Sequence, residues 1–514
     1  MNTKQLTILG ALLGFFVTSK AQNSDEALLF SQYDQGSTAR FKAMGNAQTS
    51  LGGDISNISG NPAGLGFFNS SDFAISLDYF GDKNKATYFG NPYNDTKDRF
   101  GLNQLGIVFN LPNMRARGSN LDQGWINFNV GIGYTKTNSF HSKLTYFGNN
   151  PNSSIADYFM DQTYLDQNSV IGKIGWDFGL FDQGKSGDPY YGMTSLNNEQ
   201  GIMNSYSGFQ SETNLSFGAN YSNKFYLGAS IGLATIDYKA NRHFYEDGFI
   251  EDLTYLKTQP NWQESRFVTD EGYKELLNSD FEYDDQVWSH TKGTGVNLKL
   301  GMIYRPDDIF RIGISATTPT WYRMSDGWDD YYGIVNYEPN GGAQIGDPAE
   351  DATQGNYAEY NLRTPYRLNG GVSAVFSRGL LSADVEFVDY ASMHFSSSDN
   401  PDIELYNEQI KNSYQGAVNF KVGGEFIVTP AFLLRAGYNH QGNPYKENDY
   451  KAQSISGGLG FRFGNYYVDA TYQNWRQEYN HSPYSFTPEM GFETPVASIK
   501  NTRNYVFLTI GTKF

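Results

Sequence analysis

The chain ends in a short segment in which apolar and polar residues alternate. This segment is Arg503–Phe514, RNYVFLTIGTKF, and Thr509 and Lys513 lie on its polar face. The apolar face consists of Val506, Leu508, Ile510 and Phe514. Because successive strand residues point to opposite faces, the pattern predicts a strand with lipid on one side and water on the other. Such a terminal strand can close a β-barrel, and the alternative is the last strand of a soluble β-sandwich.

About fourteen alternating segments precede and include this one, and the first begins at Asp72. Bacterial single-chain barrels have an even number of strands. Short connections of two to four residues alternate with long ones, and the exception among the short ones is the link near Pro112–Gln123. The long connections lie near 81–99, 136–211, 239–290, 319–362, 394–412, 441–452 and 481–502. This alternation is typical of barrels with periplasmic turns and extracellular loops.

The two faces of the predicted strands differ in charge. The apolar face carries no charged residue, and the opposite face carries Asp78, Lys299, Arg311, Arg367, Asp384, Glu386, Lys421, Glu425, Arg435, Arg462 and Asp469. A Lys or Arg on the lipid face at mid-bilayer costs roughly 2–4 kcal/mol, which explains this sorting. The sequence therefore predicts an all-β fold: a transmembrane antiparallel β-barrel of about fourteen strands over residues 72–514, with the charges in its lumen.

The N-terminal residues have the features of an export signal. Lys4 precedes the short apolar stretch Leu6–Val17, and Ser19-Lys20-Ala21 places small residues before Gln22. We therefore expect a signal peptide over residues 1–21. No later apolar run approaches the roughly 18 residues that a spanning helix needs. The chain has 38 Tyr, 37 Phe, 55 Gly and no Cys, which suits aromatic girdles and excludes disulfides.

The net charge of −17 argues against binding to nucleic acid. A negative mean hydropathy is expected for a barrel, because only alternate strand residues meet lipid. The lipid bilayer of an outer membrane is thus the predicted surrounding, with acidic residues in the outward loops.

Residues 22–71 do not alternate and are expected to form a separate unit. Asp25–Tyr33 and Thr38–Met44 are candidates for short helices. The segment is too apolar for a disordered tail, because it contains Leu28, Leu29, Phe30, Phe41, Met44, Leu51, Ile55 and Ile58. We therefore predict a small hatch, or plug, in the lumen.

The predicted hatch resembles that of the FadL/TodX-type outer-membrane transporters of hydrophobic compounds. The matching residues are Arg40, Met44-Gly45, Gly53-Asp54-Ile55-Ser56 and Asn61-Pro62-Ala63-Gly64-Leu65, together with Tyr304-Arg305-Pro306-Asp307 before Phe310-Arg311-Ile312-Gly313. The likeness covers the whole chain in architecture, but in motifs only residues 36–68 and 300–316. It looks most like members from Bacteroidetes-type bacteria.

The resemblance implies passive uptake of lipophilic molecules such as long-chain fatty acids into a Gram-negative cell. Extracellular loops would capture the ligand, a lumen pocket above the hatch would hold it, and a wall opening would release it sideways. Asp54, Asn61, Pro62 and Ala63 would be the hatch motif, and the strand ending in Phe514 would meet the barrel-assembly machinery. The longer loops 136–211 and 319–362 leave the ligand class open.

The family also has a kinked third strand. In this chain Gly131 and Gly133 fall on the inward face of the third segment, where they permit either a bulge or close contact with the hatch. Asp54 and Asn61 are expected to tie hatch turns through their side chains, with Pro62 fixing the turn between them.

Five lumen cations are candidate anchors for a ligand carboxylate, because charge-assisted hydrogen bonds are strong. They are Arg435, Lys421, Arg462, Arg367 and Lys299. The alternative is that they pair with the lumen acids Asp384, Glu386, Glu425 and Asp469 and hold the wall together.

Other functions rest on weaker patterns. The six histidines, His141, His243, His290, His394, His440 and His481, show no paired metal spacing. The acidic runs Asp280–Asp285 and Asp326–Asp330 lack a known calcium-loop spacing. Phe140–Leu165 is a candidate loop helix with an apolar capture surface. Without a nucleophile motif we expect neither an enzyme nor a cofactor. A surface adhesin or scaffold, or a barrel that binds haem or an aromatic hydrocarbon through its loops, is the alternative function.

Overall fold

The computed structural model describes residues 24–34, 36–114, 122–167, 169–398, 403–447, 450–487 and 491–514. The predicted signal peptide lies outside these residues. Among the helices of the described ranges, none combines the length and the apolar character that crossing a membrane requires.

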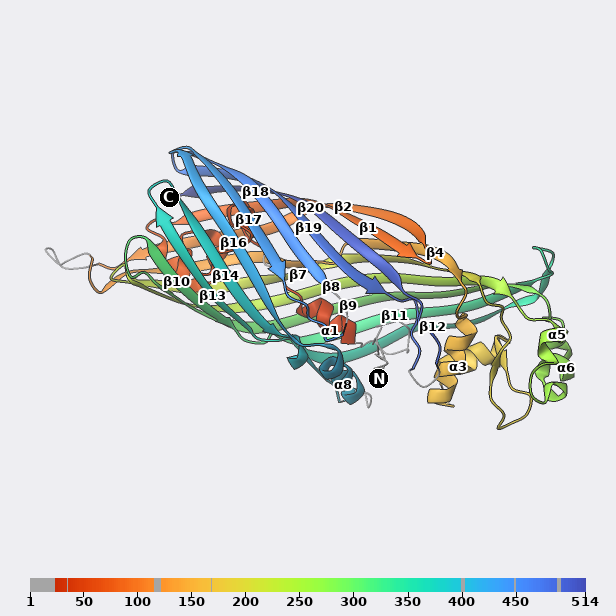
Figure 1. Cartoon of the computed structure of the whole chain (residues 1–514). Coiled ribbons are helices and arrows are strands. Elements are labelled where there is room, and N and C mark those ends of the chain that lie inside the picture. The colour runs from red at the N-terminus through yellow and green to blue at the C-terminus, as the bar shows by residue number, and fades with distance from the viewer. Residues whose placement is uncertain are drawn as a thin grey trace, which may run out of the picture.

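Fourteen antiparallel strands close into a barrel (Figure 1). β1 (Asp72–Tyr88) pairs along its whole length with β20 (Ala497–Lys513), which closes the wall. The undivided strands between them are β2 (Asn91–Pro112), β7 (Asn198–Tyr221), β8 (Phe225–Phe249), β9 (Asp280–Tyr304), β14 (Gly379–Asp389), β16 (Gly416–Thr429), β17 (Phe432–Gln441), β18 (Lys451–Phe463) and β19 (Tyr466–His481).

Three places in the wall are filled by two strands in series, and β14 is in addition extended by the short β15 (His394–Ser396), which pairs with β12. β3 (Trp125–Ser139) is followed by β4 (Ser142–Asn150), and both pair with β7. The other two series are β10 (Phe310–Thr317) with β11 (Trp321–Tyr337), and β12 (Gln344–Arg363) with β13 (Arg367–Phe376). Pro319 and Pro365 lie at these two breaks, where a residue without an N–H cannot contribute to the ladder.

The predicted sorting of residues between the two faces is confirmed. Along β9, the outward side chains of Val296, Leu298 and Leu300 are 42%, 48% and 62% exposed, whereas Asn297 and Lys299 between them are 1% and 3% exposed. The next outward residues along β9, Thr294 and Lys292, are polar. An apolar belt therefore surrounds the barrel, and charged side chains point into the lumen.

Several predicted loops are in fact strands. Residues 81–99 were expected to form a long loop, but β1 and β2 extend through them and meet at a turn with Phe89 and Gly90 at positive φ. Most of 319–362 likewise belongs to β11 and β12, which project far beyond the apolar belt (Figure 1). Beyond the belt both faces of a strand meet water, so no apolar alternation is required there.

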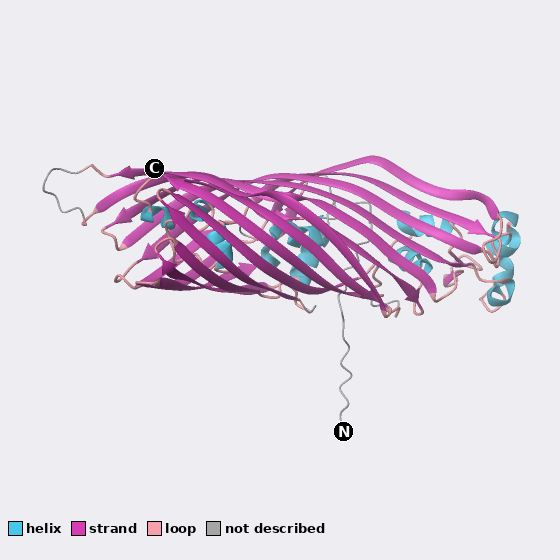
Figure 2. Cartoon of the chain, turned by 90° about the horizontal axis from the view of Figure 1, so that it is seen from above, coloured by secondary structure: helices cyan, strands magenta, loops and turns pink. Residues whose placement is uncertain are grey.

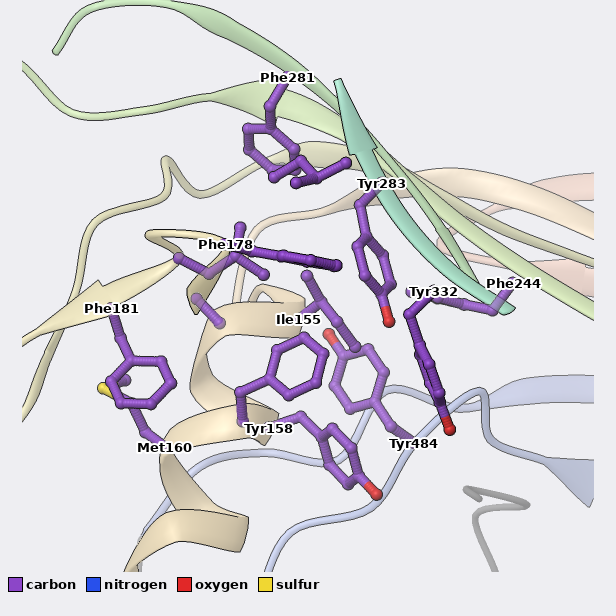
Figure 3. Packing of buried hydrophobic residues seen from close by; sticks show 14 of the residues in the cluster. Ile155, Tyr158, Met160, Phe178, Phe181, Phe244, Phe281, Tyr283, Tyr332 and Tyr484 are labelled. Carbon is purple, nitrogen blue, oxygen red and sulfur yellow. The ribbon is translucent and has the colours of Figure 1, made fainter. Parts of the chain in front are cut away.

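Helical loops cover the outer end of the barrel. We call residues 151–167, 169–197 and 250–279 the cap. Its helices are α3 (Ile155–Leu165), α4 (Val170–Asp177), α5 (Leu253–Leu256), η3 (Trp262–Glu264), α6 (Arg266–Thr269) and α7 (Glu271–Lys274), with the short pair β5 (Phe181–Asp182) and β6 (Tyr191–Gly192). Figure 3 shows Ile155 and Tyr158 of α3 packed against Phe244, Tyr283 and Tyr484 from the wall strands and the last loop.

The N-terminal segment, residues 24–34 and 36–71, lies inside the barrel, where helices are visible between the strands (Figure 2). Its helices are α1 (Ser24–Ser31), α2 (Ala39–Ala43), η1 (Ile55–Ile58) and η2 (Pro62–Phe67). Wall side chains bind its backbone: the Thr471 hydroxyl donates to the Ala39 carbonyl at 2.5 Å, and the Ser216 hydroxyl donates to the Ile58 carbonyl at 2.6 Å. Another loop places α8 (Ile403–Ser413) beside α1, and η4 (Tyr390–Ser392) and β15 (His394–Ser396) pack against α8.

Candidate functional site

Two short turns of the N-terminal segment are held by side-chain caps. The Asp54 carboxylate accepts from the Ser56 N–H at 3.0 Å and from the Thr38 hydroxyl at 2.9 Å. The Asn61 side chain accepts from the Ala63 N–H at 3.1 Å, and Pro62 occupies the first position of η2. These caps fix the backbone of the predicted hatch motif as Asp54 and Asn61 were expected to do, and a part of the motif in transport stays a prediction.

The same segment is pressed against glycines of the wall. The Asn61 amide donates to the Thr49 carbonyl at 2.6 Å, and a Cβ built on Gly301 would lie 1.8 Å from the Asn61 Oδ1. A Cβ on Gly131 would lie 2.8 Å from the Ile58 side chain. Gly131 therefore serves close approach of the segment, whereas the β-bulges of β3 lie elsewhere, one of them between Lys136 and Asn138.

Two of the five predicted ligand-binding cations lie low in the wall and hold carboxylates. Arg435 is fully enclosed and contacts Glu425 at 2.7 Å and Asp469 at 2.6 Å. Arg462 contacts the same Asp469 at 2.9 Å. Glu425 also receives Arg40 of α2 at 2.9 Å, so this cluster ties the segment to β16, β17 and β18.

The other three predicted cations line one small polar cavity of about 60 Å³. Lys299 pairs with Glu212 and donates to the Ser59 carbonyl at 2.8 Å. Arg367 and Lys421 both contact Glu386, at 3.4 Å and 3.3 Å. All five cations therefore have carboxylate partners, and their role as ligand anchors is still only predicted.

A larger cavity of about 250 Å³ lies above the N-terminal segment. Small-molecule sites usually begin at roughly 300 Å³, so the space is close to ligand size. Its apolar and aromatic lining comes from α1, the β3–β4 junction, β4, β7, β8, β19 and one distant loop, namely Leu28, Leu29, Phe140, Leu144, Tyr206, Tyr238, Tyr479 and Tyr445. At its polar end Arg503 contacts the Asp82 carboxylate at 2.8 Å. The other lining residues are polar and include Asp25, His481 and Arg503, so the cavity combines an aromatic wall with polar groups, which suits a ligand with an apolar body and a polar end.

The barrel wall is interrupted beside this cavity. β2 pairs with β3 only from Gln104↔Thr135 to Pro112↔Asn127, although β1 pairs with β2 along its full length. Farther out, β4 lies on the lumen side of β1, because the inward Asn84 amide donates to the Lys143 carbonyl at 2.6 Å. Within the described residues, β2 beyond Gln104 thus has no strand partner on this side.

The third wall strand bends inward at Phe140 and His141, between β3 and β4. Gly208 of β7 faces the bend with a φ of +106°, and its carbonyl accepts from the Phe140 N–H at 3.1 Å. A Cβ on Gly208 would lie 2.0 Å from the Asp237 carbonyl oxygen, so only glycine fits this position. The bend leaves an opening in the ladder between β2 and β7, which we call the wall gap.

Two basic side chains of β2 cross the wall gap. Lys97 donates to the Tyr206 carbonyl at 2.7 Å and to the Ser205 hydroxyl at 3.1 Å. Arg99 lies 3.0 Å from the His141 Nδ1, and its guanidinium lies 5.3 Å from the centre of the Phe209 ring. Sequence reasoning did not identify these residues, because they fall in a stretch that was expected to be a loop.

The remaining candidates do not converge on a metal site. Among the described residues, no group of three or more His, Asp or Glu side chains is placed to hold a metal ion. The predicted loop helix is present as α3, which is buried in the cap on the side of Ile155 and Phe159 and exposed at Tyr164 and Leu165.

No protein-family model and no curated protein matches the sequence. Among solved structures, a Pseudomonas aeruginosa FadL homologue aligns over 94% of this chain and 99% of its own, with 14% identity and a TM-score of 0.52. The chain has the FadL-type barrel fold. The deltaS2 mutant of the TodX monoaromatic hydrocarbon channel aligns over 93% of this chain and 99% of its own, also with 14% identity and a TM-score of 0.52.

This FadL-type barrel is an outer-membrane protein of a Gram-negative cell. A closed, even-numbered barrel with an apolar outer belt and a polar interior is the architecture of bacterial outer-membrane proteins. The belt, the charges of the lumen and the fold therefore agree on one location.

Proposed function

We propose that this FadL-type barrel carries out passive uptake of hydrophobic compounds across the outer membrane. The observation that supports the proposal most directly is the aromatic cavity of about 250 Å³ next to an interruption in the wall. A lipophilic solute that moves from this cavity through the wall gap stays out of water, which lowers the free energy of its passage. The names of the two similar structures, a FadL homologue and a hydrocarbon channel, point to the same class of solute.

The contents of the lumen favour a sideways route. Below the cavity, α2, η1 and η2 occupy the barrel, and the polar cavity at Lys299, Arg367 and Lys421 measures only about 60 Å³. A straight path to the periplasm would require the N-terminal segment to move away from wall contacts such as Asn61 with Gly301. We infer that the segment is a hatch that directs solutes toward the wall gap.

Within this class, long-chain fatty acids are the substrate that we propose first, with monoaromatic hydrocarbons as the second candidate. Both need the apolar cavity, but only a fatty acid also needs a cation. The five lumen cations that the sequence suggested as carboxylate anchors, Arg435, Lys421, Arg462, Arg367 and Lys299, remain proposals for a later step of transport.

The proposal is tested by filling the cavity. Leu29→Trp enlarges a side chain that lines the cavity, and we expect uptake of hexadecanoate and of toluene by a transport-deficient Gram-negative strain to fall severalfold. Leu233→Trp is the matched control, because Leu233 is 59% exposed on the lipid belt and the same change there adds no bulk to the lumen. Surface amounts of both variants are measured on intact outer membranes.

If the unaltered protein gives no more uptake than an empty strain, the transport proposal fails. The barrel would then be better regarded as a surface adhesin or scaffold. If Leu29→Trp and Leu233→Trp behave alike, transport does not use this cavity.

A further inference from the structure

Charge pairing is the rule for basic side chains inside this barrel. The pairs are Arg40 with Glu425, Lys42 with Asp34, Lys136 with Asp78, Lys299 with Glu212, Arg367 and Lys421 with Glu386, Arg435 and Arg462 with Asp469, and Arg503 with Asp82. A buried charge without such a partner is costly, so the pairs are what the lumen environment demands. Arg311, near the periplasmic end, differs and stacks on the Phe67 ring of η2.

Lys97 and Arg99 depart from this rule at the wall gap. Both are half-buried, and among the described residues neither forms an ion pair with a carboxylate. Their direct partners are neutral: a carbonyl and a hydroxyl for Lys97, an imidazole and a phenyl ring for Arg99. The carboxylate of Asp82, opposite Lys97 on β1, is bound to Arg503. Two positive charges therefore lie side by side on β2 with hydrogen-bonding capacity for an anion. An ammonium and a guanidinium together suit a carboxylate.

Only the backbone of β7 and of the bend between β3 and β4 separates Lys97 and Arg99 from the cavity. Tyr206 lines the cavity with its side chain, while its carbonyl accepts from Lys97. Phe140 and Ser142 line the cavity as well, and His141 between them contacts Arg99. A solute that leaves the cavity at the bend of the third wall strand thus reaches Lys97 and Arg99 directly.

We propose that Lys97 and Arg99 form a headgroup site in the wall gap, which binds the carboxylate of an anionic amphiphile while its hydrocarbon tail lies in the cavity or in the bilayer. This inference rests on the proposed transport function and specifies its substrate: carboxylates are preferred over neutral hydrocarbons. A carboxylate would replace neutral partners of the two cations by a charged one, which strengthens the hydrogen bonds.

The contacts that Lys97 and Arg99 make in the absence of a ligand also hold the two side chains in position for binding. Lys97 and Arg99 are held across the gap by β7 and the bend, so little side-chain freedom remains to be lost on binding. The partners that a ligand displaces, the Tyr206 carbonyl and the His141 imidazole, can return when it leaves. The same two residues therefore close the gap when empty and receive an anion in transit.

The test compares an acid with an alcohol of the same length. Uptake of hexadecanoate and hexadecanol is measured at low concentration and at about pH 8, with the unaltered protein, with the double variant K97Q/R99Q and with the control K292Q/R323Q. The control removes one Lys and one Arg that are exposed on the outer surface of β9 and β11. We expect K97Q/R99Q to lower hexadecanoate uptake about tenfold and to leave hexadecanol uptake within about twofold, while the control changes neither.

Three results would overturn the headgroup site while leaving transport intact: both solutes slow equally, both speed up because the gap is merely unplugged, or neither changes. Uptake of neither solute by the unaltered protein would instead refute the transport function itself. If the double variant does not reach the membrane, K97Q alone keeps the contacts of Arg99 and decides the same question. For K97Q we expect a selective loss of about threefold, and an equal loss for both solutes contradicts the proposal.

Discussion

At the scale of single residues, the N-terminal segment and the wall meet at glycines. Gly301 leaves room for the Asn61 side chain, which in turn caps η2 and binds the Thr49 carbonyl. Gly131 does the same for Ile58. Close packing of this kind leaves no space for an added methyl group, so one substitution in the wall acts on the segment inside.

Gly301→Ala is expected to weaken this contact. The new Cβ would lie far inside the contact distance of Asn61 Oδ1, and overpacking typically costs about 1–3 kcal/mol. The midpoint of thermal unfolding in detergent, followed by heat-dependent gel mobility, should fall. Gly370→Ala is the control, since a Cβ there meets nothing within 4 Å. Equal unfolding midpoints for the two variants would contradict the prediction, because they would show that the N-terminal segment moves aside without loss of stability.

Some residues of the site were predictable and others were not. The turn-forming roles of Asp54 and Asn61 follow from local chemistry and were predicted. The lumen position of Arg435 follows from alternation, but its partner Glu425 lies on another strand, and alternation does not give register. The cavity residues Leu29 and Tyr206 come from segments far apart in sequence, so no local pattern could unite them.

At the scale of elements, the outer end of β8 anchors the cap through a buried carboxylate. Glu246 is 0% exposed and accepts from the Ser154 hydroxyl at 2.5 Å and the Ile155 N–H at 2.7 Å. The amides of Asn198 and Gln200 donate to it at 2.7 Å each. The site is well outside the apolar belt, which ends near Leu233 on the same strand.

Burial raises the pKa of Glu246 to about 7, although its hydrogen bonds oppose the shift. The aromatic neighbours Tyr88, Tyr283 and Tyr484 supply no positive charge. A carboxyl with a raised pKa binds its proton more tightly in the folded cap, so stability is greatest at low pH and falls as pH rises from about 4.5 to about 7. Above that range the ionised group costs on the order of 3 kcal/mol. Burial also raises the pKa of Asp285 to about 8, so its ionisation likewise lowers the stability of the fold as the pH rises.

The cap should therefore open more readily at about pH 8 than at about pH 5.5. Limited proteolysis within 151–197, normalised to cleavage of an unstructured peptide, measures this opening. Glu246→Gln cannot ionise and should reduce the difference between the two pH values, whereas exposed Glu199→Gln should preserve it. A cap that is cut equally fast at both pH values in the unaltered protein would contradict the assignment.

Elements were predictable where lipid imposes a pattern. The terminal segment Arg503–Phe514 was identified because every second residue there must be apolar. The outer parts of β1 and β2 were missed because polar residues occupy both of their faces. The inward bend after β3 depends on Gly208 of β7 and on pairing with a distant strand, and neither can be read from one segment.

At the scale of the whole molecule, one apolar belt sets the depth of every strand. Leu300 lies in the middle of the outward set on β9, and Thr294 lies beyond its outer edge. Position along the barrel axis, and not residue type alone, therefore decides what a substitution costs.

Leu300→Arg should destabilise the barrel by about 2–4 kcal/mol in lipid vesicles, and Thr294→Arg on the same face should cost about 0–1 kcal/mol. Guanidinium unfolding monitored by tryptophan fluorescence gives both values. Similar costs at the two positions would mean that the belt is placed wrongly on β9.

The first and last strands close the wall beside α2, where the Thr509 hydroxyl of β20 accepts from the Ala39 N–H at 2.7 Å. The N-terminal segment lies inside a wall that is continuous only when β20 pairs with β1. Closing this seam and enclosing the segment are therefore coupled, so a change that weakens the β1–β20 ladder should also loosen the packing of α2.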